Sequence, residues 1–216
     1  MHKPDLDMST LADLISRYPD LAPASESIGA ALRSLVACFS SGGKLLVCGN
    51  GGSAADSEHI VGELMKSFLL KRPVGDELKE RLIEQDESAG RKIADGLEVA
   101  LPAMSLAQAG PLSTAFANDA SAELVFAQQV LGYGRPGDAL WCLSTSGNSP
   151  NVLYAAMTAK ALGLAVIGMT GATGGALATR CDILIKVPET ETYKVQELHL
   201  PVYHAICMAV EKAFFG

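Results

Sequence analysis

Several features that would assign this chain to a special class of protein are absent. No apolar run reaches the ~18 to 20 residues needed to cross a bilayer, and the first residues lack a basic segment followed by an apolar stretch. No internal repeat and no low-complexity tract stands out. We therefore expect a cytoplasmic protein with neither a targeting signal nor a membrane anchor.

An excess of positive charge is also lacking. Lys and Arg number 17 against 24 Asp and Glu, so the formal net charge is −7. This balance argues against a broad surface for nucleic acids or anionic membranes, and we expect neither as a partner. A small phosphorylated ligand remains compatible with it, because a few backbone N–H groups and hydroxyls can bind a phosphate whatever the net charge outside.

Disulfide bonds and cysteine-based metal sites are not expected. The cysteines are odd in number, form no CxxC pair, and several lie inside apolar runs. A chain of 216 residues, 49% of them apolar, can bury a core without such links, so a metal would serve chemistry. We predict reduced, buried thiols at Cys38, Cys48, Cys142, Cys181 and Cys207.

The order of apolar and helix-like segments predicts a single α/β domain. Short runs rich in β-branched residues alternate with helix-like segments, which is typical of a parallel sheet covered by helices on both faces. Helices are expected at 10–18 and 25–39 before the sheet and at 195–215 after it, with Pro201 either kinking the last helix or marking its first turn. The expected strands cover residues 44–48, 99–106, 139–144, 164–170 and 183–187.

One segment departs from this alternation. Residues 71–98 are rich in charge and carry Leu78, Leu82 and Ile83 along one stripe. We expect an exposed helix or a hairpin of helices there, inserted after the first crossover and solvated over most of its surface.

A glycine-rich loop, Cys48-Gly-Asn-Gly-Gly-Ser-Ala-Ala-Asp, follows the first expected strand. Its glycines allow a sharp turn and a close approach of backbone N–H groups to a ligand, and Ser53 is placed to point its hydroxyl at the same spot. The pattern differs from the glycine motifs of dinucleotide and P-loop sites, so it favours a sugar phosphate over a nucleotide only weakly. The alternative is an ordinary glycine turn of a parallel sheet.

A serine-rich loop, Ser144-Thr-Ser-Gly-Asn-Ser-Pro-Asn-Val, follows the third expected strand. Its hydroxyls, at the end of a strand and the start of a helix, can surround a phosphate with neutral donors and the positive helix end. A turn with one capping residue is the alternative. Two such loops at one edge of a sheet nevertheless favour a shared ligand crevice.

Two pairs of polar residues lie on expected helices. His59 and Glu63 are four residues apart, so both project from one helix face near the glycine loop. Gln196 and His204 on the closing helix are ~80° apart around its axis and can face one site. Taken alone, the first pair is most often a surface hydrogen bond, and we interpret His199 as part of an ordinary amphipathic helix.

These four motifs, taken in order, resemble the sugar isomerase (SIS) domain family, and most closely its sedoheptulose 7-phosphate isomerases. The resemblance covers nearly the whole chain from about Ser25 onward. It implies a single SIS domain over 41–216, with a five-stranded parallel sheet between helices and a long C-terminal helix, interrupted by the charged insertion at about 71–98. It also implies a helical segment at 1–40 that packs on the core and on a partner subunit, in a homotetramer with active sites at subunit interfaces.

The function implied by the resemblance is that of a ketose/aldose phosphate isomerase. Such an enzyme converts sedoheptulose 7-phosphate to D-glycero-D-manno-heptose 7-phosphate through an enediol, in the synthesis of heptose for lipopolysaccharide or glycan precursors. Moving the carbonyl from C2 to C1 needs a base for the carbon-bound proton and an acid for the oxygens, and a carboxylate and an imidazole suit these roles. The resemblance assigns them to Glu63 and His204.

The resemblance also implies ligand-binding residues. One zinc ion per site, which would stabilise the enediolate as a Lewis acid, is expected on His59, Glu63, Gln196 and His204. The residues expected to bind the phosphosugar substrate are Asn50, Gly51, Gly52, Ser53, Asn118, Asp119, Ser144, Thr145, Ser146, Ser149 and Gln196.

The sequence departs from the family at three places. The charged insertion replaces a compact link, Lys66 or Lys71 has to substitute for an arginine shortly after the catalytic Glu, and Tyr193 replaces an aspartate found in some isomerases. Two alternatives therefore stay open: a non-catalytic SIS adaptor resembling proteins that bind a replication initiator, or an SIS isomerase for another phosphosugar. Because the adaptors lack the complete acid/base and ligand set, we favour an enzyme.

Overall fold

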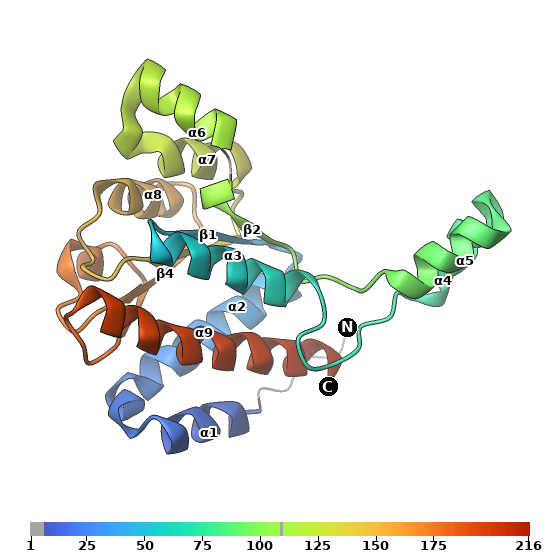
Figure 1. The fold of residues 1–216 in the computed structure, drawn as a ribbon, viewed down its shortest axis with the longest axis horizontal. Coiled ribbons are helices and arrows are strands. Elements are labelled where there is room, and N and C mark those ends of the chain that lie inside the picture. The colour runs from blue at the N-terminus through green and yellow to red at the C-terminus, as the bar shows by residue number, and fades with distance from the viewer. Residues whose placement is uncertain (1–6, 109) are drawn as a thin grey trace.

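The protein is described by a computed structural model that covers residues 7–108 and 110–216. At its centre is a parallel sheet with the strand order β2-β1-β3-β4-β5, flanked by helices on both faces (Figure 1). The predicted fold class is confirmed. Each expected strand contains one observed strand: β1 (Leu45–Cys48), β2 (Ala103–Ser105), β3 (Ala139–Leu143), β4 (Ala165–Thr170) and β5 (Ile183–Lys186).

The strand β2 is shorter than the apolar run that predicted it. Residues 99–102 lie outside the strand, and two of their backbone N–H groups donate elsewhere. Val99 donates to the carbonyl of Arg72 at 2.7 Å, and Leu101 donates to the carbonyl of Leu64 at 3.0 Å. The first half of the run is therefore bonded to the last turn of the helix after β1, at Leu64, and to Arg72 beyond that helix.

Two apolar clusters cover the two faces of the sheet. Leu45 and Val47 of β1 belong to one cluster and Leu46 and Cys48 to the other, because successive side chains of a strand point to opposite faces. The first cluster is covered by α2 (Ser25–Ser40), α3 (Gly52–Met65) and α9 (Thr192–Phe215), and the second by α7 (Val125–Tyr133) and α8 (Pro150–Ala161).

The N-terminal segment forms α1 (Ser9–Arg17), η1 (Pro19–Ala24) and α2. Leu14 of α1 is buried in the first apolar cluster, and α1 packs on the outer side of α9 (Figure 1). The first six residues of the predicted segment 1–40 lie outside the described residues.

The closing helix α9 begins at Thr192, three residues before the predicted start. Pro201 therefore lies inside the helix, where it is buried, and does not mark its first turn. The helix continues to Phe215 and runs beside α3, so residues far apart in the sequence line one seam (Figure 1).

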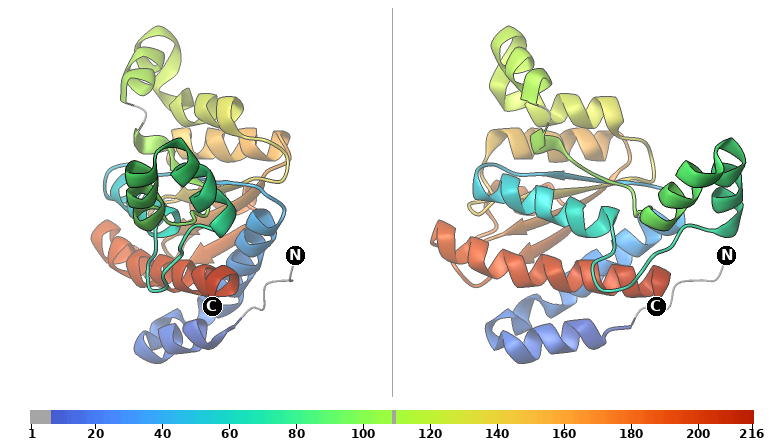
Figure 2. Two further views of the ribbon diagram at one scale, coloured as in Figure 1. Left: turned by 90° about the vertical axis from the view of Figure 1, so that its right-hand side faces the viewer. Right: turned by 45° about the vertical axis from the view of Figure 1, so that its right-hand side comes forward.

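The charged insertion is a helical hairpin that projects from the domain (Figures 1 and 2). It consists of α4 (Asp76–Gln85) and α5 (Glu87–Gly96), joined at Asp86, whose carboxylate caps α5 by accepting from the Ala89 N–H at 2.7 Å. An isolated bridge between Pro73 and Glu98 closes its base. This matches the expected hairpin of helices.

A second projection follows β2. It contains η2 (Leu106–Gln108), α6 (Gly110–Phe116), a π-helical turn η3 (Ala117–Ser121) and η4 (Ala122–Leu124), before α7 returns to the sheet (Figure 1). The remaining short helix is η5 (Gly175–Thr179).

The cysteines are free thiols. Cys38, Cys48, Cys142 and Cys207 are buried and Cys181 is half-buried, which agrees with the prediction of reduced thiols except for this partial exposure. Burial raises the pKa of Cys38 to about 11. Within residues 7–108 and 110–216, no helix is long and apolar enough to cross a membrane.

Candidate active site

The glycine-rich loop joins β1 to α3 through a turn that only glycine adopts easily. Gly51 has a φ of +56°, and α3 begins at the next residue. A Cβ on Gly52 would lie 2.5 Å from Nε2 of Gln196, so the missing side chain is what allows α9 to approach this loop. Ser53, in the first turn of α3, is 3% exposed.

The serine-rich loop between β3 and α8 is ordered by its own hydroxyls. The N–H of Gly147 donates to Oγ of Ser144 at 3.1 Å, and the hydroxyls of Ser144 and Ser149 lie 3.3 Å apart. Gly147 has a φ of +68°, and a Cβ there would lie 2.1 Å from the carbonyl oxygen of Gly174. The loop therefore folds tightly against the turn before η5.

The two loops meet at the carboxyl edge of the sheet. The side-chain amides of Asn50 and Asn151 exchange two hydrogen bonds of 2.9 Å, which tie one loop to the other. Between them is a cavity of about 270 Å³. We call it the loop cavity, and it is lined by Asn50, Gly51, Gly52, Ser53, Leu143, Ser144, Thr145, Ser149, Thr192 and Gln196.

The loop cavity, of about 270 Å³, is distinct from a groove of about 330 Å³ that lies beside His204 between α1 and α9. A wider hollow of about 610 Å³ opens between α2 and the β5 edge of the sheet. Of the three, only the loop cavity is lined by the glycine and serine loops together, so it is the one with the backbone N–H groups and hydroxyls that suit a phosphate.

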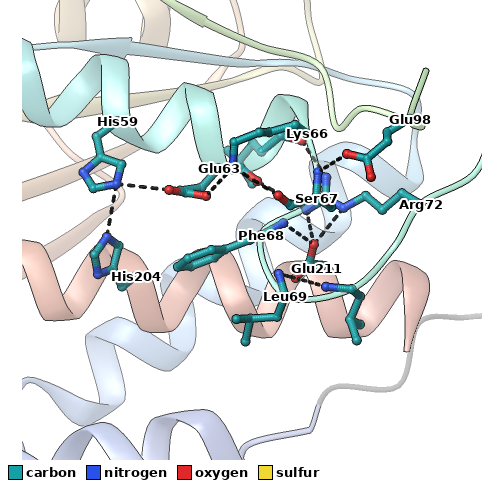
Figure 3. Close-up of polar contacts among 12 residues, drawn as sticks. His59, Glu63, Lys66, Ser67, Phe68, Leu69, Arg72, Glu98, His204 and Glu211 are labelled. Atoms are coloured by element: carbon teal, nitrogen blue, oxygen red, sulfur yellow. Dashed lines mark hydrogen bonds and ion pairs between the residues drawn. The ribbon is translucent and has the colours of Figure 1, made fainter. Parts of the chain in front are cut away.

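The predicted acid/base residues lie farther along the seam between α3 and α9 (Figure 3). Nε2 of His59 is 3.1 Å from Oε1 of Glu63 and 3.4 Å from Nε2 of His204. The side chain of Glu63 is 12% exposed, and its Oε2 lies 3.2 Å from Nζ of Lys66. The structure therefore brings His59, Glu63 and His204 together within one subunit.

Two residues behind His59 were missed by the sequence analysis. The hydroxyl of Tyr203 lies 3.0 Å from Nδ1 of His59 and donates to Oδ1 of Asp56 at 3.3 Å. These contacts hold the ring of His59 so that its Nε2 faces Glu63 and His204. The available signals were positional, since Asp56 precedes His59 by one helical turn and Tyr203 precedes His204 directly.

The electrostatics of the seam favour a neutral imidazole at His204. Burial lowers the pKa of His204, the nearby His59 lowers it further, and Glu63 opposes the shift. A neutral imidazole can donate a proton from one nitrogen and accept one at the other. Burial raises the pKa of Asp56, an effect that the Tyr203 hydrogen bond and His59 oppose.

Of the four predicted zinc ligands, Gln196 lies apart from the other three. Gln196 and His204 are eight residues apart on α9, or ~12 Å along the axis, and the amide of Gln196 lies over Gly52 in the loop cavity. Across residues 7–108 and 110–216, no group of three or more His, Cys, Asp or Glu side chains has a geometry that could hold a metal ion. Zinc binding by these residues stays a prediction.

The remaining predicted residues lie apart from these two places. Ser146 is exposed and does not line the loop cavity. Asn118 and Asp119 are exposed on the π-helical turn η3, where the Asn118 amide donates to the Asp119 carboxylate at 2.9 Å. Their contacts with substrate stay predictions.

The positions that depart from the family are also resolved. Lys66 contacts Glu63, whereas the side chain of Lys71 is 91% exposed and lies 3.9 Å from Glu98. Of the two candidate cations, only Lys66 therefore reaches the acid/base residues. Tyr193, in the first turn of α9, is 57% exposed.

Comparison with known proteins relates the chain to one family over most of its length. The family model described as SIS domain matches residues 11–99 and 93–171. The phosphoheptose isomerase of Rhodospirillum rubrum is 42% identical over 205 residues, which is 94% of this chain and 93% of that protein. A phosphoheptose isomerase of Burkholderia pseudomallei is 39% identical over 197 residues, or 89% of this chain and 87% of the other.

Solved structures give the same relationship. The structure of phosphoheptose isomerase GmhA from Neisseria gonorrhoeae matches with a TM-score of 0.73 and 31% identity, over 94% of this chain and 95% of the other. A phosphoheptose isomerase from Francisella tularensis matches with a TM-score of 0.69 and 29% identity, over 94% and 92% of the two chains.

Proposed function

The chain belongs to the SIS domain family, and from this premise we propose that it is a phosphoheptose isomerase. It is an aldose–ketose isomerase, and its proposed reaction is the conversion of sedoheptulose 7-phosphate to D-glycero-D-manno-heptose 7-phosphate. The product would supply heptose for lipopolysaccharide or glycan precursors. The cytoplasmic location expected from the sequence belongs to the same proposal.

The observation that carries this proposal is the alignment of two places along one helix seam. The loop cavity lies where Gln196 meets Gly52, and the acid/base residues lie where His204 meets His59, about two helical turns farther on. A sugar phosphate with a long carbon chain has the same layout, because its ester group and its reacting carbons are at opposite ends. The neutral donors of the loop cavity would bind the phosphate ester, while Glu63 and His204 would act on C1 and C2.

In the proposed mechanism, Glu63 takes a proton from C1 of the ketose and returns it to C2. As the C1 proton leaves, the C1–H electron pair forms the C1–C2 double bond of the enediol, and O2 is protonated. Loss of the proton on O1 then restores a carbonyl at C1 and completes the aldose. The neutral imidazole of His204 suits the two oxygen steps, and a well-placed acid or base contributes typically ~10²- to 10⁴-fold.

We further propose the homotetramer with active sites at subunit interfaces. Two features support it. His204 opens onto the groove of about 330 Å³ that is also lined by Arg17 and Glu197, so the acid/base residues are not closed off within one subunit. Large apolar side chains are exposed on α6, α7 and α8, at Leu112, Leu131, Tyr154 and Met157. Light scattering after size-exclusion chromatography measures the number of subunits.

The zinc ion stays a prediction from the resemblance. The proton transfers above are assigned to side chains of this chain, and a bound zinc ion would stabilise the enediolate as a Lewis acid. Elemental analysis of the purified protein measures whether zinc is bound.

Incubation with sedoheptulose 7-phosphate tests the proposed function. We expect the aldose phosphate to form, detected by anion-exchange chromatography or NMR, and to be lost in Glu63→Gln. Turnover of a pentulose phosphate in place of the heptulose would assign the site to another phosphosugar. No turnover with any phosphosugar, together with stable binding of a protein partner, would replace the enzyme with the adaptor.

A further inference from the structure

A short segment crosses from α3 to the insertion and lies against the end of α9 (Figure 3). We call residues 66–72 the strap. Three consecutive N–H groups of its backbone donate to the carboxylate of Glu211 on α9, which is 1% exposed. Oε1 of Glu211 accepts the N–H of Phe68 at 2.8 Å, and Oε2 accepts those of Leu69 and Leu70 at 2.7 and 3.2 Å.

The cation of this arrangement is Arg72, at the end of the strap and also 1% exposed. Its Nε donates to Oε1 of Glu211 at 2.9 Å, and a second guanidinium nitrogen lies 2.7 Å from the same oxygen. The guanidinium also donates to the backbone carbonyls of Leu64 at 2.8 Å and Glu63 at 3.3 Å. Both carbonyls belong to the last turn of α3, where carbonyls lack partners within the helix, so Arg72 caps the helix that carries Glu63.

Glu211 is held as a carboxylate by these donors. Burial on its own would raise the pKa of Glu211, but the hydrogen bonds from Phe68, Leu69 and Arg72 lower it below its ordinary value. The two charges are buried together and satisfy each other, and removal of either one would leave the other unpaired away from water.

This pair is one contact away from both proposed acid/base residues. On one side, Arg72 bonds to the backbone of Glu63 itself. On the other, Glu211 fixes the backbone of Phe68, whose ring packs on the ring of His204 with centroids 5.5 Å apart. Neither Arg72 nor Glu211 lines the loop cavity or contacts the side-chain atoms proposed to react.

We propose that Arg72 and Glu211 are positioning residues for the isomerisation. Together they fix the last turn of α3 and the ring that covers His204, and so set the separation of the base and the imidazole. This inference rests on the proposed function. Because the loop cavity is at the other end of the seam, loosening the pair should lower kcat and leave KM for the phosphosugar nearly unchanged.

The test compares Glu211→Gln with a matched control, Asp138→Asn. Asp138 is 4% exposed and has similar bonding, since its carboxylate accepts the backbone N–H groups of Lys44 at 2.9 Å and Arg135 at 2.8 Å and pairs with the Lys44 ammonium. It precedes β3, at the edge of the sheet opposite the loop cavity. Both variants lose one buried charge, so both should unfold at lower denaturant concentration.

We expect Glu211→Gln to lower kcat by about 10-fold or more with KM within about twofold of wild type, because misplacement of reacting groups by ~1 Å can cost 10²-fold. Asp138→Asn should keep the wild-type kcat per folded molecule. Arg72→Lys, which keeps the charge and loses the planar fork, should fall between wild type and Glu211→Gln. Phe68→Ala should lower kcat, and its effect should not add fully to that of Glu211→Gln.

The outcomes separate the two proposals. Suppose that the wild type is active and that Glu211→Gln and Asp138→Asn have the same kcat per folded molecule. This result would overturn the positioning role and leave the isomerase activity intact. Where Glu211→Gln does not fold, an unchanged kcat in both Arg72→Lys and Phe68→Ala overturns it. A folded wild type without isomerase activity would remove the proposed function and this inference with it.

Discussion

The Tyr203 hydroxyl lies 3.0 Å from Nδ1 of His59 and fixes which nitrogen of that ring faces Glu63. The two residues come from different helices, α9 and α3, and their rings pack edge to face with centroids 5.5 Å apart. Tyr203 is 1% exposed, so its hydroxyl cannot exchange this partner for bulk water. The orientation of the His59 ring is thus set by Tyr203, which lies on the buried face of α9.

We therefore expect Tyr203→Phe to lower kcat by about 10-fold through loss of one orienting hydrogen bond. The ring would keep its packing against His59, so the variant should remain folded. Binding of the phosphate ester should hardly change, because Tyr203 does not line the loop cavity. Steady-state kinetics with sedoheptulose 7-phosphate measure both values, and a wild-type kcat would show that His59 needs no such support.

Glu63→Gln tests the carbon-proton acceptor directly. The substitution keeps the size of the side chain but removes the base, so kcat should fall by at least about 10² while phosphate-ester binding remains nearly intact. Calorimetric titration of the variant with sedoheptulose 7-phosphate measures binding separately from turnover. Unaltered turnover would refute the role of Glu63.

Ser149→Ala tests the loop cavity. Ser149 lines the cavity and its hydroxyl lies 3.3 Å from that of Ser144, so its loss should remove one donor to the phosphate. We expect KM to rise several-fold with kcat nearly unchanged, because phosphate contacts persist in the ground and transition states alike. Ser146→Ala is the comparison, since Ser146 is exposed outside the cavity, and its KM should change less. A drop in kcat alone for Ser149→Ala would contradict an anchoring role.

The sheet and its two functional loops could be predicted because their signals are local. Apolar runs bounded by Gly49 and Ser144 mark where strands end, and the carboxyl ends of parallel strands meet at one edge. The spacing of His59 and Glu63 likewise follows from one helix. Each of these inferences needs only neighbouring residues and a known period.

What could not be predicted depends on contacts between distant segments. Glu211 and Arg72 are 139 residues apart, and nothing near either position indicates that the two would be buried together. Nothing in the sequence distinguishes Tyr203 from an ordinary core residue, because its contact with His59 depends on the packing of α9 beside α3. The shortened β2 has the same origin, since Val99 is bonded to the strap by a contact that its own apolar run does not reveal.

The buried His199 predicts how stability depends on pH. It is 0% exposed, and neither ring nitrogen makes a hydrogen bond among the described residues. Burial lowers its pKa from 6.5 to about 4, and the nearby backbone carbonyl of Thr170 opposes the shift. In the folded protein this ring therefore stays neutral at pH values where the unfolded chain would protonate it.

The sign follows from proton binding. Below pH 6.5 the unfolded state binds one proton more at this position than the folded state, so the free energy of unfolding falls as the pH falls toward about 4. Above pH 6.5 His199 is neutral in both the folded and the unfolded state, so it causes no change in the free energy of unfolding with pH. Between pH 6.5 and about 4, at 1.36 kcal/mol per pH unit, the free energy of unfolding falls by roughly 3 kcal/mol through His199.

We expect His199→Leu to remove this component of the acid sensitivity. Denaturant titrations at intervals from pH 8 to pH 4 give the free energy of unfolding of both proteins, and the carboxylates contribute equally to both curves. The difference between the curves should be constant above about pH 6.5 and should grow below it in favour of the variant, by roughly 1.4 kcal/mol per pH unit. Curves that stay parallel down to pH 4 would mean that His199 takes up its proton in the folded state, through an opening of α9 that lets water reach the ring.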